Sequence, residues 1–115
     1  MSFGDYLWNE PCARCQAKRD AAAIANLKNT YLTAADVNTE YYRSLSHALY
    51  HRDIPYVLLM HIGAFDAEML WPLPRLHRAK GFRFVTLPQA EARSTITITM
   101  LISAFRPIRR QWKMR

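Results

Sequence analysis

The stretch PYVLLMH, residues 55–61, decides the fold of this chain. After Pro55 come five consecutive apolar residues, 56–60, with no polar residue between them. A continuous apolar run of this length is typical of a strand buried on both faces in a parallel sheet. The run ends at His61, so the sequence predicts a titratable side chain at the C-terminal end of a parallel strand. Catalytic side chains of α/β barrels project from such strand ends.

The chain beyond His61 predicts a further helix and a further strand. The expected elements are a tight exit at 62–66, a helix at 67–80, a strand at 82–87 and a last turn at 88–92. Pro72 and Pro74 interrupt the helical composition, so we expect them to kink or shorten that helix. Gly81 is the predicted C-cap of this helix.

Two helices are predicted before the apolar run. The expected elements are a strand end with a loop at 1–9, a helix at 17–32 and a second helix that Thr33 caps and that reaches about His51. Apolar residues of the second helix recur at intervals of three and four, which predicts a stripe packed against the sheet. This stripe consists of Val37, Tyr41, Leu45, Ala48 and Leu49.

Helices that alternate with buried strands predict an α/β architecture with right-handed crossovers. Only two or three strands are visible, and a closed barrel needs more. We therefore expect a sheet with open edges. With 115 residues, half of them hydrophobic, the chain is long enough for one small globular domain.

The sequence argues against a membrane span and an export signal in this chain. No run approaches the roughly 18 apolar residues that cross a bilayer. The first residues, MSFGDYLWNEP, contain neither a basic n-region nor an apolar h-region.

The net charge of +7 comes from the tail. Residues 1–92 are close to neutral, whereas the tail contains no acidic residue and these basic ones: Arg93, Arg106, Arg109, Arg110, Lys113 and Arg115. A near-neutral body lacks the basic face that phosphate binding requires, which argues against a nucleic-acid partner unless the last residues hold it.

Two residue pairs could suggest a metal or redox site. Cys12 and Cys15 form a C-x-x-C, but a zinc ribbon needs a second pair, and a redox pair should open a helix after a buried strand. We predict two ordinary thiols in a loop after Pro11. His47 and His51 have the spacing that places two imidazoles on one helix face, yet no upstream carboxylate accompanies them. We expect them, and His77, to bind no metal.

The residues around His61 resemble the end of the NodB homology domain of polysaccharide deacetylases, the fourth carbohydrate esterase family. In that family a hydrophobic strand ends in Leu-x-His, here Leu59-Met60-His61, and the closing strand reads Gly-(Phe/Tyr)-x-Phe-Val-x-Leu, as at residues 81–87. The preceding family motif is Asp-x-x-Asp followed by an aromatic residue. It aligns with Ser2-Phe3-Gly4-Asp5-Tyr6, where Ser2 replaces the first aspartate and Tyr6 stands where tryptophan is common.

The resemblance covers residues 1–92 and implies the C-terminal βα units of a partial (β/α) barrel. It implies metal-dependent hydrolysis of N-acetyl groups on an acetylated poly- or oligosaccharide, in which a metal-bound water attacks the acetyl carbonyl and an acid protonates the departing amine. His61 matches the acid, Asp5 the aspartate that orients it, and Leu59 a wall of the acetyl-methyl pocket. Tyr6 and Trp8 are candidates for lining a sugar groove.

Each of these residues also has a structural interpretation that the sequence leaves open. A lone histidine can be satisfied by a backbone partner, and Asp5 can be a solvated loop carboxylate or a helix cap. Tyr6 and Trp8 fit ordinary packing equally well.

The family's metal-binding half has no counterpart in this sequence. The Thr-Phe-Asp-Asp motif, which carries the base and a metal-binding aspartate, and the His-x-x-x-His-Pro pair are both absent. The parent family uses a divalent metal, zinc or similar, and we expect this chain to hold none and to be inactive alone, so that a complementing N-terminal half is its implied partner. Members of the family are often exported or envelope-associated.

Residues 93–115 depart from the family and form an atypical basic tail. Residues 94–102 alternate like a strand, and residues 106–115 are basic. One hypothesis is a one-frame slip near Ala92; the alternative is a real added strand with a basic end. The alternative function is a small non-enzymatic α/β module whose cationic tail binds nucleic acid or an anionic surface.

Overall fold

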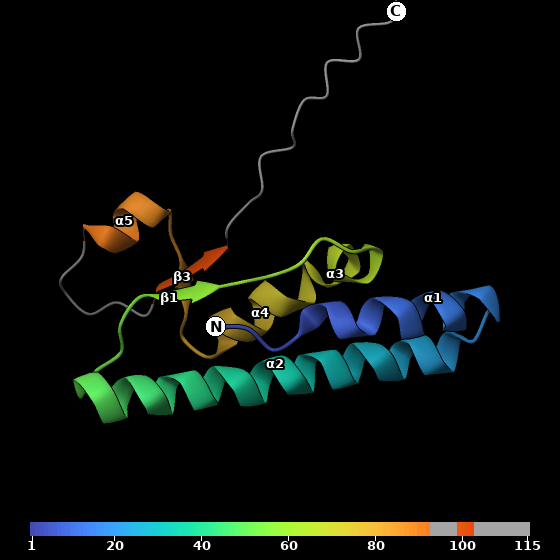
Figure 1. Ribbon diagram of the computed structural model, residues 1–115, viewed down its shortest axis with the longest axis horizontal. Coiled ribbons are helices and arrows are strands. Elements are labelled where there is room, and N and C mark those ends of the chain that lie inside the picture. Colours follow the sequence, from blue (N-terminus) through green and yellow to red (C-terminus); the bar gives the residue numbers. More distant parts are fainter. Residues whose placement is uncertain (93–98, 103–115) are drawn as a thin grey trace, which may run out of the picture.

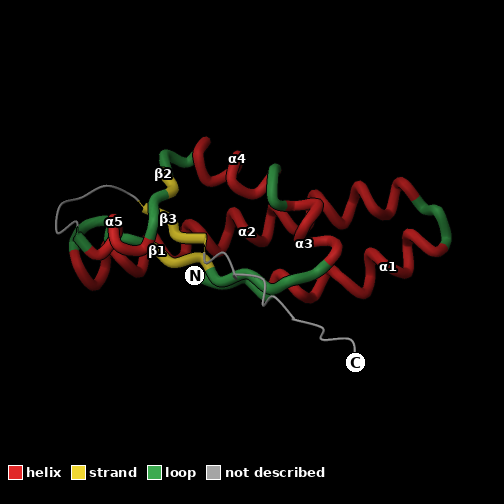
Figure 2. The backbone as a smooth tube through the Cα atoms, turned by 90° about the horizontal axis from the view of Figure 1, so that it is seen from above, coloured by secondary structure: helices red, strands yellow, loops and turns green. Residues whose placement is uncertain are grey.

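A computed structural model describes residues 1–92 of the protein in full and residues 99–102 by their backbone. The elements are the 3₁₀ helix η1 (Asp5–Trp8), α1 (Asn9–Ala17), α2 (Ala21–Tyr50), β1 (Tyr56–Leu58), α3 (Ala64–Met69), α4 (Pro72–Ala79), β2 (Arg83–Phe84), α5 (Leu87–Glu91) and β3 (Thr99–Ile102). Helices α1 and α2 form an antiparallel pair, and the sheet lies over the C-terminal half of α2 (Figures 1 and 2).

Helix α2 is one uninterrupted helix, so the prediction of two helices divided at Thr33 is wrong. No glycine or proline occurs within Ala21–Tyr50 to break it. The Thr33 hydroxyl donates to the Asn29 carbonyl within the helix and caps nothing. The true N-cap is Asp20, whose carboxylate accepts a hydrogen bond from the Ala23 amide at 2.9 Å.

The face that α2 buries is not the face that its apolar spacing predicts. All five residues of the predicted stripe are exposed, and the buried residues are Tyr31, Ala35, Thr39 and Ser46. Three of these four are small, which lets neighbouring elements approach the helix axis closely. Their hydroxyls are satisfied: Thr39 donates to the Ala35 carbonyl and Ser46 to the Arg52 carbonyl. The stripe prediction is therefore wrong.

The sheet has three parallel strands in the order β1-β3-β2. Strand β1 is shorter than predicted, and only one of its faces is buried. Tyr56 and Leu58 point into the core, whereas Val57 is 49% exposed and Leu59, just past the strand, is exposed as well. The expectation of burial on both faces is wrong, because the helices cover one face of β1. Whether this sheet is part of a NodB-type barrel stays a prediction.

The segment after His61 follows the predicted pattern more closely. The helical region is divided into α3 and α4, and Pro72 and Pro74 lie in the first turn of α4, where a missing N–H costs little. The C-cap of α4 is Lys80, one residue earlier than predicted, and Gly81 follows it with a φ of 85°, the left-handed conformation that commonly ends a helix. The next strand is shorter than predicted, and α5 begins at Leu87 with Thr86 and Gln89 forming a capping box.

The predictions for the two ends of the chain have different outcomes. Residues 5–17 are helical and contain Cys12 and Cys15, so the predicted loop is wrong there; Pro11 is tolerated in the first turn of α1. In the tail, Thr99–Ile102 forms β3 between the other two strands, within the stretch 94–102 that alternates like a strand. Residues 94–98 and the basic stretch 106–115 lie outside the described residues, and the frame-slip hypothesis stays a hypothesis.

The core lies between α2, the sheet and helices α3 and α4. Its largest fully buried apolar side chains are Tyr31, Phe65, Met69 and Leu73. Within the described part of the chain, no helix is both long enough and apolar enough to cross a membrane.

Candidate functional site

The structure brings Asp5 and His61 together from segments 56 residues apart in sequence. Gly4 adopts the left-handed conformation, with a φ of 69°, and starts the turn that carries Asp5 into η1. His61 lies in the loop between β1 and α3. The Leu59 amide donates to the Met1 carbonyl at 2.9 Å, which ties this loop to the N-terminal segment.

Asp5 binds His61 through both of its carboxylate oxygens. One oxygen accepts the His61 backbone N–H at 2.6 Å, and the other lies 2.8 Å from the His61 Nδ1. Asp5 is fully buried, whereas the His61 side chain is 46% exposed. Because an ionised carboxylate can only accept, this contact assigns the proton to Nδ1. The ring is thus fixed in orientation, and none of the described residues bonds its Nε2.

One exposed aromatic ring contacts the imidazole, and exposed aliphatic residues occur in the same loop as His61. The Tyr6 ring meets the His61 ring edge to face, with centroids 4.8 Å apart and planes at 66°. Tyr6 and Leu59 are each more than half exposed, and Ile62 is 86% exposed. An exposed aromatic ring beside a titratable ring, with two exposed aliphatic residues in the same loop, is suited to contact with the apolar parts of a ligand.

Trp8, the other predicted substrate-binding residue, lies in the contact between η1 and α2. Its ring packs on Tyr31, with centroids 5.4 Å apart, and its Nε1 donates to the Thr30 hydroxyl at 3.0 Å. Phe3 also contacts this ring. These contacts are of the packing kind, and the predicted role of Trp8 in sugar binding stays a prediction.

A second buried carboxylate, Asp66, lies beside this pair and was not singled out from the sequence. Asn9 donates to Asp66 at 2.7 Å, and the Asn9 side-chain oxygen accepts the Phe65 amide at 3.1 Å. Burial raises the pKa of Asp66, and the nearby Asp5 carboxylate adds to this rise, while the hydrogen bond from Asn9 opposes it. Burial, helped by the charge of Asp66, also raises the pKa of Tyr31.

Asn9 therefore joins η1, which carries Asp5, to the start of α3, which follows the His61 loop. Besides Asp66 and Phe65, its amide reaches the Tyr6 carbonyl at 3.4 Å. The Asn9 side chain passes so close to Gly63 that a Cβ at that position would overlap it. The sequence does show Asn9 one helical turn after Asp5, and Gly63 and Asp66 shortly after His61. These residues did not predict the contact, because each also fits an ordinary turn or helix start.

The other candidate metal or redox residues lie apart from the Asp5–His61 pair in structural settings, and Cys12 and Cys15 are both free thiols. His47 pairs with Asp53 at 3.4 Å, and His51 ends α2 in the left-handed conformation. Cys12 is buried, and this burial raises the pKa of its thiol, which makes it a poor nucleophile. His77 is buried with its Nε2 3.1 Å from the Thr39 hydroxyl. Among the described residues, no group of three or more histidine, cysteine, aspartate or glutamate side chains could hold a metal ion.

Comparisons with protein-family models, with curated proteins and with solved structures found no match to this chain.

Proposed function

We propose that the chain is the C-terminal part of a NodB-type polysaccharide deacetylase and that His61 is its acid. The reaction is hydrolysis of the C–N bond of an N-acetyl group on a carbohydrate. The observation that carries the proposal is the double hydrogen bond of the buried Asp5 carboxylate to His61, because these are the two residues that the family motifs pair.

The geometry supports a division of labour between the two residues. Asp5 accepts the Nδ1 proton, which leaves Nε2 as the nitrogen that exchanges a proton with the substrate. His61 acts as the acid in its doubly protonated form, in which Nδ1–H stays bonded to Asp5. Water adds to the acetyl carbonyl carbon; when the C–N bond then breaks, the amine nitrogen takes the Nε2 proton, the ring is left neutral, and the acetyl group leaves as acetate. Asp5 positions the ring and does not contact the substrate.

The flanking side chains suit the acetyl group and the sugar. Leu59 is exposed next to the histidine loop, as a wall for the acetyl methyl requires, and Tyr6 presents an aromatic ring beside the imidazole. Aromatic rings of this kind contact the apolar face of a sugar through their large rigid surface.

The described residues do not fit the divalent metal that the family uses, because they offer no three-ligand cluster. No step on this chain is therefore assigned to a metal. We propose that the metal and the base belong to a complementing N-terminal half, and that the chain releases no acetate by itself.

The test is acetate release from chitooligosaccharides in the presence of Zn²⁺. We expect no release from the chain alone. We expect release when it is mixed with the N-terminal half of a NodB-type deacetylase that retains the aspartate and paired-histidine motifs and ends before the Asp-x-x-Asp motif.

The matched control is His61→Gln in the same mixture, since His61 is on the surface and glutamine keeps a polar side chain that exchanges no proton. We expect at least a hundredfold less acetate from this variant. Equal release by the two chains would remove His61 from the reaction, and strong release by the chain alone would refute the need for a second half.

A further inference from the structure

Among the strands that the structure describes, β1 lies at the edge of the sheet, and Met1 already lies along its outer side. The Met1 amino group donates to the Val57 carbonyl, and the Leu59 amide donates to the Met1 carbonyl. In a parallel pair, a residue bonds to the two residues that flank its partner on the other strand. Met1 bonds to Val57 and Leu59, so its partner is Leu58 and the pairing is parallel. The direction and register of pairing on this edge are therefore set by Met1.

The same edge of β1 continues past Met1 toward Pro55. Backbone groups of alternate residues in a strand point to the same side, so the Val57 N–H and the Pro55 carbonyl face the edge that Met1 occupies. In the parallel register, a residue two positions before Met1 would accept from the Val57 N–H and donate to the Pro55 carbonyl. Edge groups of this kind are a template for pairing with another chain.

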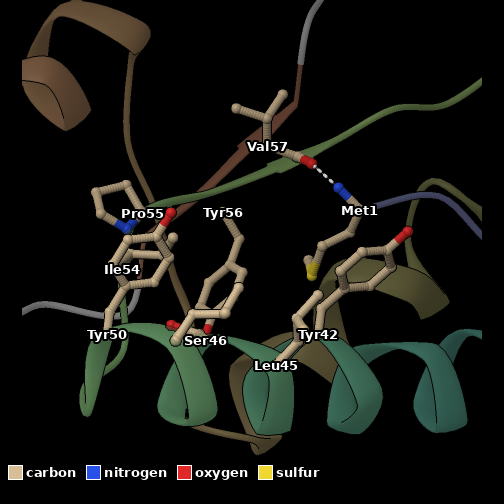
Figure 3. A pocket seen from close by; sticks show the side chains of 10 residues that line it. Met1, Tyr42, Leu45, Ser46, Tyr50, Ile54, Pro55, Tyr56 and Val57 are labelled. Carbon is tan, nitrogen blue, oxygen red and sulfur yellow. Dashed lines mark hydrogen bonds between the residues drawn. The ribbon is translucent and has the colours of Figure 1, made fainter.

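A groove of about 280 Å³ lies between this edge and helix α2 (Figure 3). The side chains that line it carry no charge: Met1, Tyr42, Leu45, Ser46, Leu49, Tyr50, Ile54, Pro55, Tyr56 and Val57. Leu45 and Leu49 belong to the exposed apolar stripe of α2. Met1 closes one end of the groove, and Tyr50 and Pro55 lie at the other (Figure 3).

The edge and the groove fit one kind of occupant. Side chains two residues apart in a strand point to the same face, and the Met1 side chain lines the groove. In a segment paired upstream of Met1, every second side chain therefore points into the groove toward Leu45 and Leu49. An uncharged lining favours apolar side chains at those positions.

We propose that β1 and this groove form a docking site for an extended segment of another polypeptide, which adds to the sheet as a parallel strand with apolar side chains at alternate positions. A symmetric second copy fits less well, because two β1 edges related by a two-fold axis would pair antiparallel. The inference does not rest on the chemistry of His61, so either proposal can fail without the other.

The experiment fuses a probe segment ahead of Met1 in the full chain, where the linkage supplies a high effective concentration. The sequence Leu-Thr-Leu-Thr directly before Met1 places both leucines on the groove side. The control Thr-Leu-Thr-Leu has the same composition but places them on the opposite side. We expect the first extension to raise Tm by about 5 °C over the second. We also expect it to slow hydrogen exchange of the Val57 amide at least about tenfold.

A groove substitution separates docking from a general effect of the extension. Leu49→Lys changes an exposed residue, so it should leave the unextended chain stable and cancel the gain from Leu-Thr-Leu-Thr. Val37→Lys, an exposed position on the same helix outside the groove lining, should leave that gain intact. Equal Tm and equal Val57 exchange with the two extensions would overturn the proposal. The proposal would also be overturned if the unextended chain formed a dimer that Leu49→Lys abolishes. The occupant of the groove would then be a second copy of this chain.

Discussion

Asn9 and Gly63 are in contact, and the absence of a side chain at Gly63 is what lets the Asn9 amide reach Asp66 and the amide of Phe65. This contact links the helix that follows Asp5 to the loop that follows His61. The Asp5–His61 pair is therefore held by more than its own hydrogen bonds. The small amide side chain of Asn9 and the lack of a side chain at Gly63 also contribute to its geometry.

Gly63→Ala should destabilise the protein because the new methyl displaces the Asn9 amide. Gly63 has an extended backbone with a φ of −154°, so the cost comes from the overlap and the lost hydrogen bonds, about 1–3 kcal/mol of the free energy of unfolding. Urea denaturation measures it. In an Asn9→Ala background the same substitution should cost little, and an undiminished cost there would show that Asn9 is not the obstacle.

Asp5→Ala should lower the free energy of unfolding by about 3 kcal/mol, because it removes two hydrogen bonds to a buried charged acceptor and leaves the His61 backbone N–H without its partner. The exposed Asp20→Ala, which removes the N-cap of α2, provides a comparison and should cost about 1 kcal/mol. A loss at Asp5 no larger than that at Asp20 would mean that the buried carboxylate contributes little to the fold.

His77 should make the protein less stable in mild acid. Burial lowers the pKa of His77 from 6.5 to about 4, and the positive charge of Lys80 acts in the same direction. Between these pH values the unfolded chain binds a proton that the folded chain does not, so stability falls as the pH drops from 6.5 to 4, by roughly 3 kcal/mol. Urea denaturation at a series of pH values measures the loss. His77→Gln should flatten this slope, and an unchanged slope would assign it to other groups.

The sequence predicted the elements whose signals are local. Proline in the first turn of α4, the left-handed Gly81 after it and the turn of α5 depend on residues within a few positions of each other. The run ending near His61 and the motif at Asp5 likewise pointed to two residues that the structure brings together.

The errors occurred where a choice depended on distant neighbours. The stripe of α2 from Val37 to Leu49 has helical spacing, but spacing cannot tell which face the sheet and α4 will cover. The small residues Ala35 and Thr39 form the buried face because they allow close approach. The roles of Asn9 and Asp66 could not be predicted either, because a hydrogen bond between residues 57 positions apart leaves no periodic pattern in the sequence.

The central claim is that Asp5 holds the His61 ring with the proton on Nδ1. Long-range ¹H–¹⁵N correlation spectra of the histidine ring test it most directly, with Asp5→Asn as the comparison. The account predicts that the neutral His61 ring carries its proton on Nδ1 and that Asp5→Asn weakens this preference. A neutral ring protonated on Nε2 in the wild-type chain would contradict the account.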